Sequence, residues 1–179
     1  VVDSGLNGID KNDDEWEKMA KVYLYVSSAM TYGETFDVVK DATEYDAIVC
    51  GVGICGDYAI MLRLLALNAG IEADVARQDD IVGNEHAWTI AKIDGDWYHF
   101  DACWQSAIGQ GLDYFGLSDN LEKNNLRSLS EDYYPEIVIK SDNYFDNDTS
   151  QHSCLKSISQ EKYDELEEKN KQLQQQIDA

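Results

Sequence analysis

Proline, basic residues and long hydrophobic runs are all scarce in this chain. Its 179 residues include one proline, which excludes a proline-rich linker protein. No apolar run approaches the roughly 20 residues of a membrane-spanning helix, so we expect no membrane span. Only 14 lysines and arginines stand against 35 acidic residues, and the net charge is −21.

The acidic surface narrows the choice of partner. A net charge of −21 repels phosphate backbones, which argues against nucleic-acid binding. The same charge attracts cationic peptides or amines, although it also serves solubility alone. The chain is 44% apolar, which is enough for a core, and its length favours one domain with a tail.

Metal-binding signatures are weak. The four cysteines form no CxxC pair and have no zinc-site spacing. Asp10, Asn12 and Asp14 alternate as in a calcium loop, but Glu15 stands where such a loop needs glycine. The aspartates between residues 141 and 158 lack such a turn as well. We therefore expect no metal and no cofactor.

The pattern of polar and apolar residues divides the chain into four segments. We expect an N-terminal arm at 1–12, a domain at 13–146, a linker at 147–159 and a C-terminal helix at 160–179. The last segment has a heptad spacing with Asn170 at one core position, over fewer than three heptads. A weak homodimer through this helix and a helix packed on the protein surface both remain open.

Within the domain, the order of expected elements is helices first and strands second. Helices are expected at 13–30, around 41–48, and at 55–69, where Gly70 is a C-terminal stop. Expected strands follow at 71–77, 85–93 and 96–104, and short strands or packed loops are expected at 114–117 and 135–139. The Asp94-Gly95 dipeptide between two of them is a strong signal for a two-residue hairpin.

Cys55 has the surroundings of a reactive thiol. It begins an apolar helix directly after the glycine-rich turn 51–53. Unpaired N–H groups and the positive end of the helix dipole favour thiolate over thiol at such a place. The same N–H groups can bind an oxyanion. A small buried cysteine is the alternative for Cys55 taken alone.

The hairpin supplies a base and a group to orient it. With Asp94-Gly95 as the turn, Trp88 lies opposite Asp101 and His86 lies opposite Cys103, all on one face. His86 and Asp101 are then diagonal neighbours within reach of each other. His99 lies nearer the turn, and His152 falls in the linker. Cys55, His86 and Asp101 therefore combine as nucleophile, base and orienting carboxylate.

Three separated motifs resemble the transglutaminase-like superfamily of papain-related cysteine enzymes. They are G-x-C-x-x-Y-A at 53–59, H-A-W at 86–88 and W-x-x-x-D at 97–101, and the resemblance extends over about residues 16–144. It implies an α+β fold in which the helix of Cys55 packs on an antiparallel sheet that carries His86 and Asp101. It also implies that these three residues are catalytic.

Three further residues are expected to bind substrate or form the wall of the site: Tyr58, Trp88 and Cys103. The sequence departs from the family pattern at Cys103, where threonine is common, and at Glu85, where a small or uncharged residue is common. Cys103 lies on the face of the triad, so a disulfide with Cys50 and two free thiols are both open.

The resemblance implies acyl transfer through a thioester, on amide groups of a protein or peptide substrate. The compact size favours hydrolysis, as a bacterial peptidase or amidase, over cross-linking of glutamine to amines. A non-catalytic protein-binding scaffold is the alternative from another class. We expect a secreted or cell-surface location rather than a cytoplasmic one, although the cysteines do not settle it.

Overall fold

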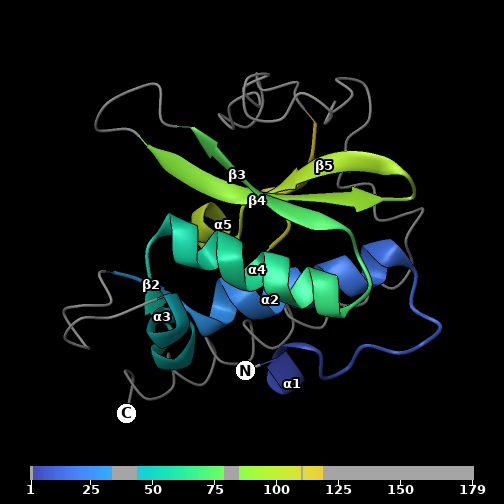
Figure 1. Ribbon diagram of the computed structural model, residues 1–179, viewed down its shortest axis with the longest axis horizontal. Coiled ribbons are helices and arrows are strands. Elements are labelled where there is room, and N and C mark those ends of the chain that lie inside the picture. The colour runs from blue at the N-terminus through green and yellow to red at the C-terminus, as the bar shows by residue number, and fades with distance from the viewer. Residues whose placement is uncertain (1, 34–43, 79–84, 110, 119–179) are drawn as a thin grey trace, which may run out of the picture. The chain divides into compact units, whose positions relative to one another are not determined.

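The structure is a computed structural model that describes residues 2–33, 44–78, 85–109 and 111–118, with only the backbone of residues 44–46. The described residues belong to one compact unit, Val1–Asn147. In this unit, helices lie under one face of a four-stranded antiparallel sheet (Figure 1). The α+β class expected from the sequence is therefore confirmed.

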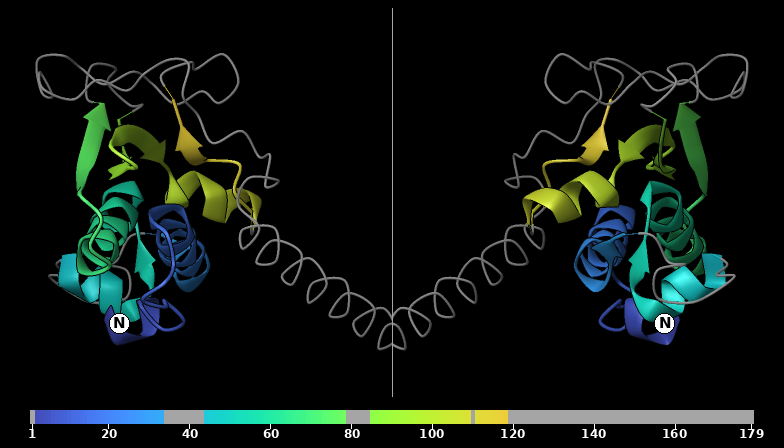
Figure 2. Two further views of the ribbon diagram at one scale, coloured as in Figure 1. Left: turned by 90° about the vertical axis from the view of Figure 1, so that its right-hand side faces the viewer. Right: turned by 90° about the vertical axis from the view of Figure 1, so that its left-hand side faces the viewer.

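Two long helices form the layer beneath the sheet. Helix α2 (Glu15–Ala29) and helix α4 (Cys55–Asn68) pack against each other, and α4 also packs on the sheet (Figure 2). The buried residues of α2 include Trp16, Met19, Tyr23 and Val26. Their three- and four-residue spacing is the amphipathic pattern from which this helix was predicted.

Helix α2 begins with a complete capping box. The carboxylate of Asp14 accepts a hydrogen bond from the Glu17 backbone N–H at 2.7 Å, and the Glu17 carboxylate accepts one from the Asp14 N–H at 3.0 Å. Both groups would otherwise be orphan donors at a helix start. Asp14 is thus the N-cap of α2.

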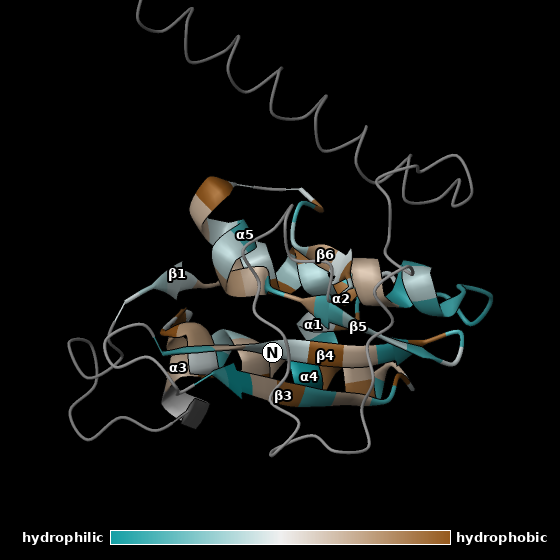
Figure 3. Ribbon diagram, turned by 90° about the horizontal axis from the view of Figure 1, so that it is seen from above, coloured by the Kyte–Doolittle hydropathy of each residue, from teal (hydrophilic) through white to brown (hydrophobic). Residues whose placement is uncertain are grey.

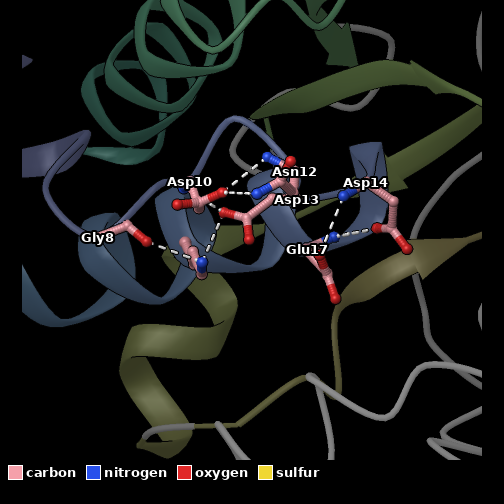
Figure 4. Close-up of polar contacts among 7 residues, drawn as sticks. Gly8, Asp10, Asn12, Asp13, Asp14 and Glu17 are labelled. Carbon is pink, nitrogen blue, oxygen red and sulfur yellow. Dashed lines mark hydrogen bonds and ion pairs between the residues drawn. The ribbon is translucent and has the colours of Figure 1, made fainter.

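The aspartates before α2 are bonded to protein donors. Asp10 accepts hydrogen bonds from the backbone and side chain of Asn12 at 2.8 and 2.7 Å (Figure 4). Lys21 donates to Asp13 at 2.6 Å and to the Gly8 carbonyl at 2.8 Å. The Lys21 ammonium group thus forms an ion pair with Asp13.

The N-terminal segment expected to be an arm packs on the domain at its start. Helix α1 (Val2–Gly5) buries Gly5. A Cβ atom at Gly5 would lie 2.6 Å from the Leu65 side chain and 3.1 Å from that of Tyr25. Glycine at this position leaves room for the side chains of Leu65 on α4 and Tyr25 on α2, so the start of the segment packs closely on both helices.

A glycine-rich turn leads into α4. Helix α3 (Glu44–Cys50) ends at Gly51, whose φ is 68°, and strand β2 (Val52–Gly53) then pairs in parallel with β1 (Thr31–Tyr32). A Cβ atom at Gly53 would lie 2.6 Å from the Asp57 Cβ and 2.9 Å from the Met30 Cε. Only glycine permits this close approach.

The main sheet has the strand order β3-β4-β5-β6. The strands are β3 (Ala73–Gln78), β4 (His86–Ile93), β5 (Asp96–Phe100) and β6 (Phe115–Leu117). Asp94 and Gly95 both have positive φ, at 52° and 88°, as a type I′ hairpin turn requires. The hairpin predicted at Asp94-Gly95 is confirmed, and Ile93 pairs with Asp96 across the turn.

The second strand of the hairpin is shorter than predicted. The last pair is Thr89 with Phe100, so the expected pairs of Trp88 with Asp101 and of His86 with Cys103 do not form. Asp101 instead caps helix α5 (Ala102–Ile108). Its carboxylate accepts the Trp104 N–H at 2.9 Å, and aspartate is among the best N-cap residues, so a helix begins where a strand was expected.

Both faces of the sheet contain buried residues. On the helix side, Trp16 contacts Tyr98 edge-to-face at 4.8 Å, and Thr89 donates a hydrogen bond to the Ala59 carbonyl at 3.1 Å. On the opposite face, Trp88 and Ile90 are buried as well. Figure 3 shows the hydrophobic residues along the middle of β4.

Several sequence predictions lie outside the described residues. They concern the short strand or packed loop at 135–139, the linker, the C-terminal helix with its dimer, His152 and Cys154. In the ranges that the structure does describe, no helix is long and apolar enough to cross a membrane.

Candidate active site

Cys55, His86 and Asp101 lie at the ends of three different elements. Cys55 is the first residue of α4, His86 is the first of β4, and Asp101 is the N-cap of α5. The first three residues of β4, 86–88, have no partner on β5, because the pair at this end of the hairpin is Thr89 with Phe100. The unpaired edge that results is where the other two residues approach His86.

The imidazole of His86 is bonded to the carboxylate of Asp101. His86 Nε2 lies 2.5 Å from Asp101 Oδ2. The Asp101 side chain is fully buried, and its second oxygen accepts the Trp104 N–H. Its backbone is held as well, because its N–H donates to the Tyr114 carbonyl at 2.9 Å and its carbonyl accepts the Tyr23 hydroxyl at 3.2 Å. The carboxylate therefore fixes one nitrogen of the imidazole and leaves Nδ1 for another partner.

The surroundings of His86 favour its charged form. Burial alone would lower the pKa of His86. The hydrogen bonds to Asp101 and Cys55, together with the negative charges of both, outweigh burial and raise the pKa to about 9. His86 is therefore an imidazolium ion at neutral pH.

The pKa of the Cys55 thiol shifts in the opposite direction to that of His86. Burial would raise the pKa of its thiol, but hydrogen bonds from His86 and from the Ala87 backbone N–H oppose it. The imidazolium charge and the Gly56 N–H act in the same direction, and the net result is a lowered pKa. These contacts, together with the helix N-terminus, favour the thiolate form of Cys55.

Two indole rings flank the imidazole of His86. Trp104 is nearly parallel to it, with ring centroids 4.8 Å apart and an interplanar angle of 17°. Trp88 is also nearly parallel, at 5.8 Å and 19°. The indole N–H of Trp88 donates to Nδ1 of the buried His99 at 2.9 Å, so the second histidine of the hairpin is bonded to a tryptophan.

The three residues expected to form the wall of the site are placed beneath its surface. Tyr58 and Trp88 are 1% exposed and Cys103 is 5% exposed. Ser106 joins two of them, because its hydroxyl donates to the Cys103 carbonyl at 2.7 Å and lies within hydrogen-bond distance of the Tyr58 hydroxyl, at 3.2 Å. Their place in substrate binding or in the wall of the site stays a prediction.

The cysteines of the described ranges are free thiols. Cys50 is exposed, Cys55 is half-buried and Cys103 is buried. The alternative of two free thiols therefore holds over a Cys50–Cys103 disulfide. Burial, followed by the charges of Asp101 and Cys55, holds the pKa of Cys103 well above its ordinary value, so Cys103 is a neutral thiol.

Sequence reasoning missed the residues that hold Asp101 in place. Tyr23 and Gln105 are both buried. The Tyr23 hydroxyl shares its proton between the Asp101 carbonyl and the Gln105 amide oxygen, which lies 3.3 Å away and also accepts the Asp113 N–H at 2.8 Å. The spacing of Tyr23 marks it as a core residue of α2 and gives no sign of its polar contacts. Trp104 was visible as an aromatic residue three positions after Asp101, which is where an N-cap finds its backbone donor.

A free thiol at a helix start beside an imidazole–carboxylate pair is an arrangement suited to cysteine-based catalysis. Residues 6–102, more than half of the chain, match the sequence model of the Transglutaminase-like superfamily. The chain belongs to this superfamily. The membership supports cysteine-based catalysis in general.

Two of the solved structures that are similar to this chain illustrate the likeness. One is a candidate cysteine protease from Cytophaga hutchinsonii, with 20% identity and a TM-score of 0.45 over 57% of this chain and 35% of that chain. The other is a TGase, with 19% identity and a TM-score of 0.43 over 56% of this chain and 29% of that chain. The chain thus spans about a third of the length of either structure. No curated protein matches it.

Proposed function

We propose that this protein cleaves amide bonds of a protein or peptide substrate through a thioester on Cys55. The observation that carries the proposal is the contact set of His86, which is bonded to the buried Asp101 and reaches the Cys55 thiol. These contacts support His86 as the general base and acid, and Asp101 as the group that orients it.

The acylation step follows from the protonation states of the pair. The Cys55 thiolate attacks the amide carbon, and a C–S bond forms as the carbonyl oxygen becomes an oxyanion. The His86 imidazolium then gives its Nδ1 proton to the leaving nitrogen. The C–N bond breaks, the amine departs, and the acyl group remains on Cys55 as a thioester.

The oxyanion has a candidate donor at the start of α4. The Cys55 backbone N–H is the first of the helix, and among the residues that the structure describes no backbone carbonyl accepts it. A donor of this kind becomes most favourable when negative charge develops on the carbonyl oxygen. It therefore stabilises the tetrahedral intermediate more than the bound substrate.

Water is the proposed acceptor of the acyl group. Neutral His86 takes a proton from water, the hydroxyl adds to the thioester carbon, and the C–S bond breaks to restore the thiolate. The half-exposed position of Cys55 supports hydrolysis, because an enzyme that transfers to amines must keep water from the thioester. The net charge of −21 supports a cationic substrate, which it attracts over distance.

The test is incubation of the full chain with a glutamine-containing peptide, with and without a primary amine, followed by mass spectrometry. We expect peptide cleavage, or release of ammonia with gain of water, that is independent of the amine. Cys55→Ala, which removes only the sulfur, is the matched control and should show neither product. Incorporation of the amine would assign amine transfer instead, and an unchanged peptide would support the non-catalytic scaffold.

A further inference from the structure

Trp104 is in contact with both partners of the histidine–carboxylate pair. Its backbone N–H donates to Asp101 Oδ1 at 2.9 Å. Its indole ring lies against the imidazole of His86, nearly parallel to it, with centroids 4.8 Å apart. The two contacts come from different parts of one residue, so a side-chain substitution removes the second and preserves the first.

The indole of Trp104 is itself held in place by the segment after α5. Tyr114 contacts it edge-to-face at a centroid distance of 5.5 Å. The carbonyl of the same Tyr114 accepts the Asp101 N–H at 2.9 Å. Trp104 is half-buried, whereas the other indole beside His86, that of Trp88, is fully buried.

We propose that Trp104 is a positioning residue that holds His86 on Asp101 in its charged form and thereby maintains the Cys55 thiolate. An indole face attracts a cation, by about 0.5–2 kcal/mol depending on desolvation. The ring also limits the access of water to a hydrogen bond that water would weaken. The inference rests on the proposed function, because it takes Cys55 as the reactive thiol.

The electrostatic surroundings of His86 make the ring effect measurable. The titratable groups that face the imidazole are Cys55 from α4 and Asp101 from the start of α5. Those around that pair are the neutral thiol of Cys103, the hydroxyl of Tyr23 on α2, the preceding Glu85 and Arg77 on the neighbouring β3. None of these groups changes when the indole is replaced.

The experiment is the pH dependence of alkylation of Cys55 by iodoacetamide in the full chain, read by mass spectrometry. Trp104→Leu and Trp104→Met remove the aromatic face and keep an apolar side chain, whereas Trp104→Phe keeps a ring. Trp97→Leu is the matched control, since Trp97 packs on the cluster of Ala76, Trp88 and Ile90 in the sheet. Circular dichroism reports whether each variant folds. If the Leu variant unfolds, the Met variant is compared with the wild type in its place.

We expect the Leu and Met variants to lose imidazolium character and so to form the thiolate at higher pH. The midpoint of the rising limb should move up by roughly 0.5–1 pH unit, which is a three- to tenfold lower rate below it. The Phe variant should recover most of the loss, and in peptide turnover kcat should fall more than KM changes. Trp97→Leu should leave the midpoint in place.

A midpoint that is the same in the wild type and in the Leu or Met variant would overturn the role of Trp104. A Phe variant as impaired as the Leu variant would do so too, because it would point to a loss of packing rather than of the aromatic face. Slow alkylation of Cys55 in the wild type would instead overturn the proposed function, so the two failures are distinguishable.

Discussion

The starts of α2 and α4 solve the same problem in different ways. The first N–H groups of any helix lack partners within the helix and carry partial positive charge. At α2 the Asp14 carboxylate accepts one of them and Glu17 closes the capping box. At α4 the N-cap position is Ile54, which has no side-chain oxygen, and Asp57 reaches back only to the Ile54 N–H at 2.9 Å.

The difference separates a structural helix start from a reactive one. At α2 the positive end of the helix is neutralised by the protein's own carboxylates. At α4 the thiol of Cys55 takes that place, and the Gly56 N–H is among the groups that lower its pKa. A helix start that has no side-chain cap and lies beside an imidazolium stabilises a thiolate, whereas a capped helix start stabilises only the helix.

The start of α5 combines both uses in one residue. Asp101 caps the helix with Oδ1, as Asp14 does at α2, and binds His86 with Oδ2. A single buried carboxylate thus secures the backbone of α5 and the orientation of the imidazole.

Asp101→Asn separates these two uses and should have the largest effect. The amide oxygen of asparagine still caps α5, so the melting temperature should change little. The amide cannot stabilise the imidazolium, and turnover of peptide should fall by roughly 10⁴-fold, as it does when a buried triad aspartate is replaced. A circular dichroism melt and steady-state kinetics measure the two quantities. Full activity in this variant would refute the orienting role of Asp101.

Turnover should follow a bell-shaped pH profile that reflects the opposite shifts of Cys55 and His86. The rising limb should lie below the ordinary pKa of a thiol, because the pKa of Cys55 is lowered. The falling limb should lie near pH 9, where His86 loses the proton that the leaving group needs. A falling limb near pH 6.5, the usual pKa of histidine, would contradict a raised pKa for His86.

Gly53→Ala should disturb the start of α4 alone. The new Cβ would lie within 3 Å of Asp57 and Met30, so the turn before Cys55 must move. We expect a loss of about 1–3 kcal/mol in the free energy of unfolding, as is usual for overpacking. Because Cys55 is two residues away, its alkylation should slow as well. Gly56→Ala is the control, since a Cβ there meets nothing within 4 Å; equal effects of the two changes would argue against a positioned turn.

Asp14→Ala should give the smallest effect and complete the comparison of the two helix starts. Loss of the N-cap should lower the free energy of unfolding by about 1 kcal/mol, measured by urea denaturation. The kcat and KM for the peptide should stay at their wild-type values, because the start of α2 has no contact with the triad. A marked fall in kcat at unchanged folding would show that the two starts are not independent.

Much of the hairpin and of α4 could be predicted because local chemistry determines them. Asp94 and Gly95 tolerate the positive φ of a tight turn, and this sets the register up to Phe100. The apolar helix and its stop at Gly70 follow from the pattern and from its φ of 86°. The proximity of His86 to Asp101 was expected for a partly wrong reason, since Asp101 lies at a helix start and not in a strand.

The remaining features depend on tertiary contacts that leave no local pattern. The two-residue strands β1 and β2 are too short to show any periodicity. An aspartate after an apolar run can extend a strand or cap a helix, and the choice at Asp101 is supported by Tyr23 and Tyr114 from distant parts of the sequence. Burial of Tyr58, Trp88 and Cys103 depends likewise on what packs over them.

The most direct test of a reactive helix start is competition between cysteines of the same folded chain. Iodoacetamide at pH 7, limited to a fraction of one equivalent, should label Cys55 ahead of Cys50 although Cys50 is the more exposed thiol, with Cys103 and Cys154 as further references in the same digest. His86→Gln should abolish this preference. Labelling of Cys50 before Cys55 in the wild type would mean that exposure, and not a thiolate at the start of α4, governs reactivity, and would contradict the account.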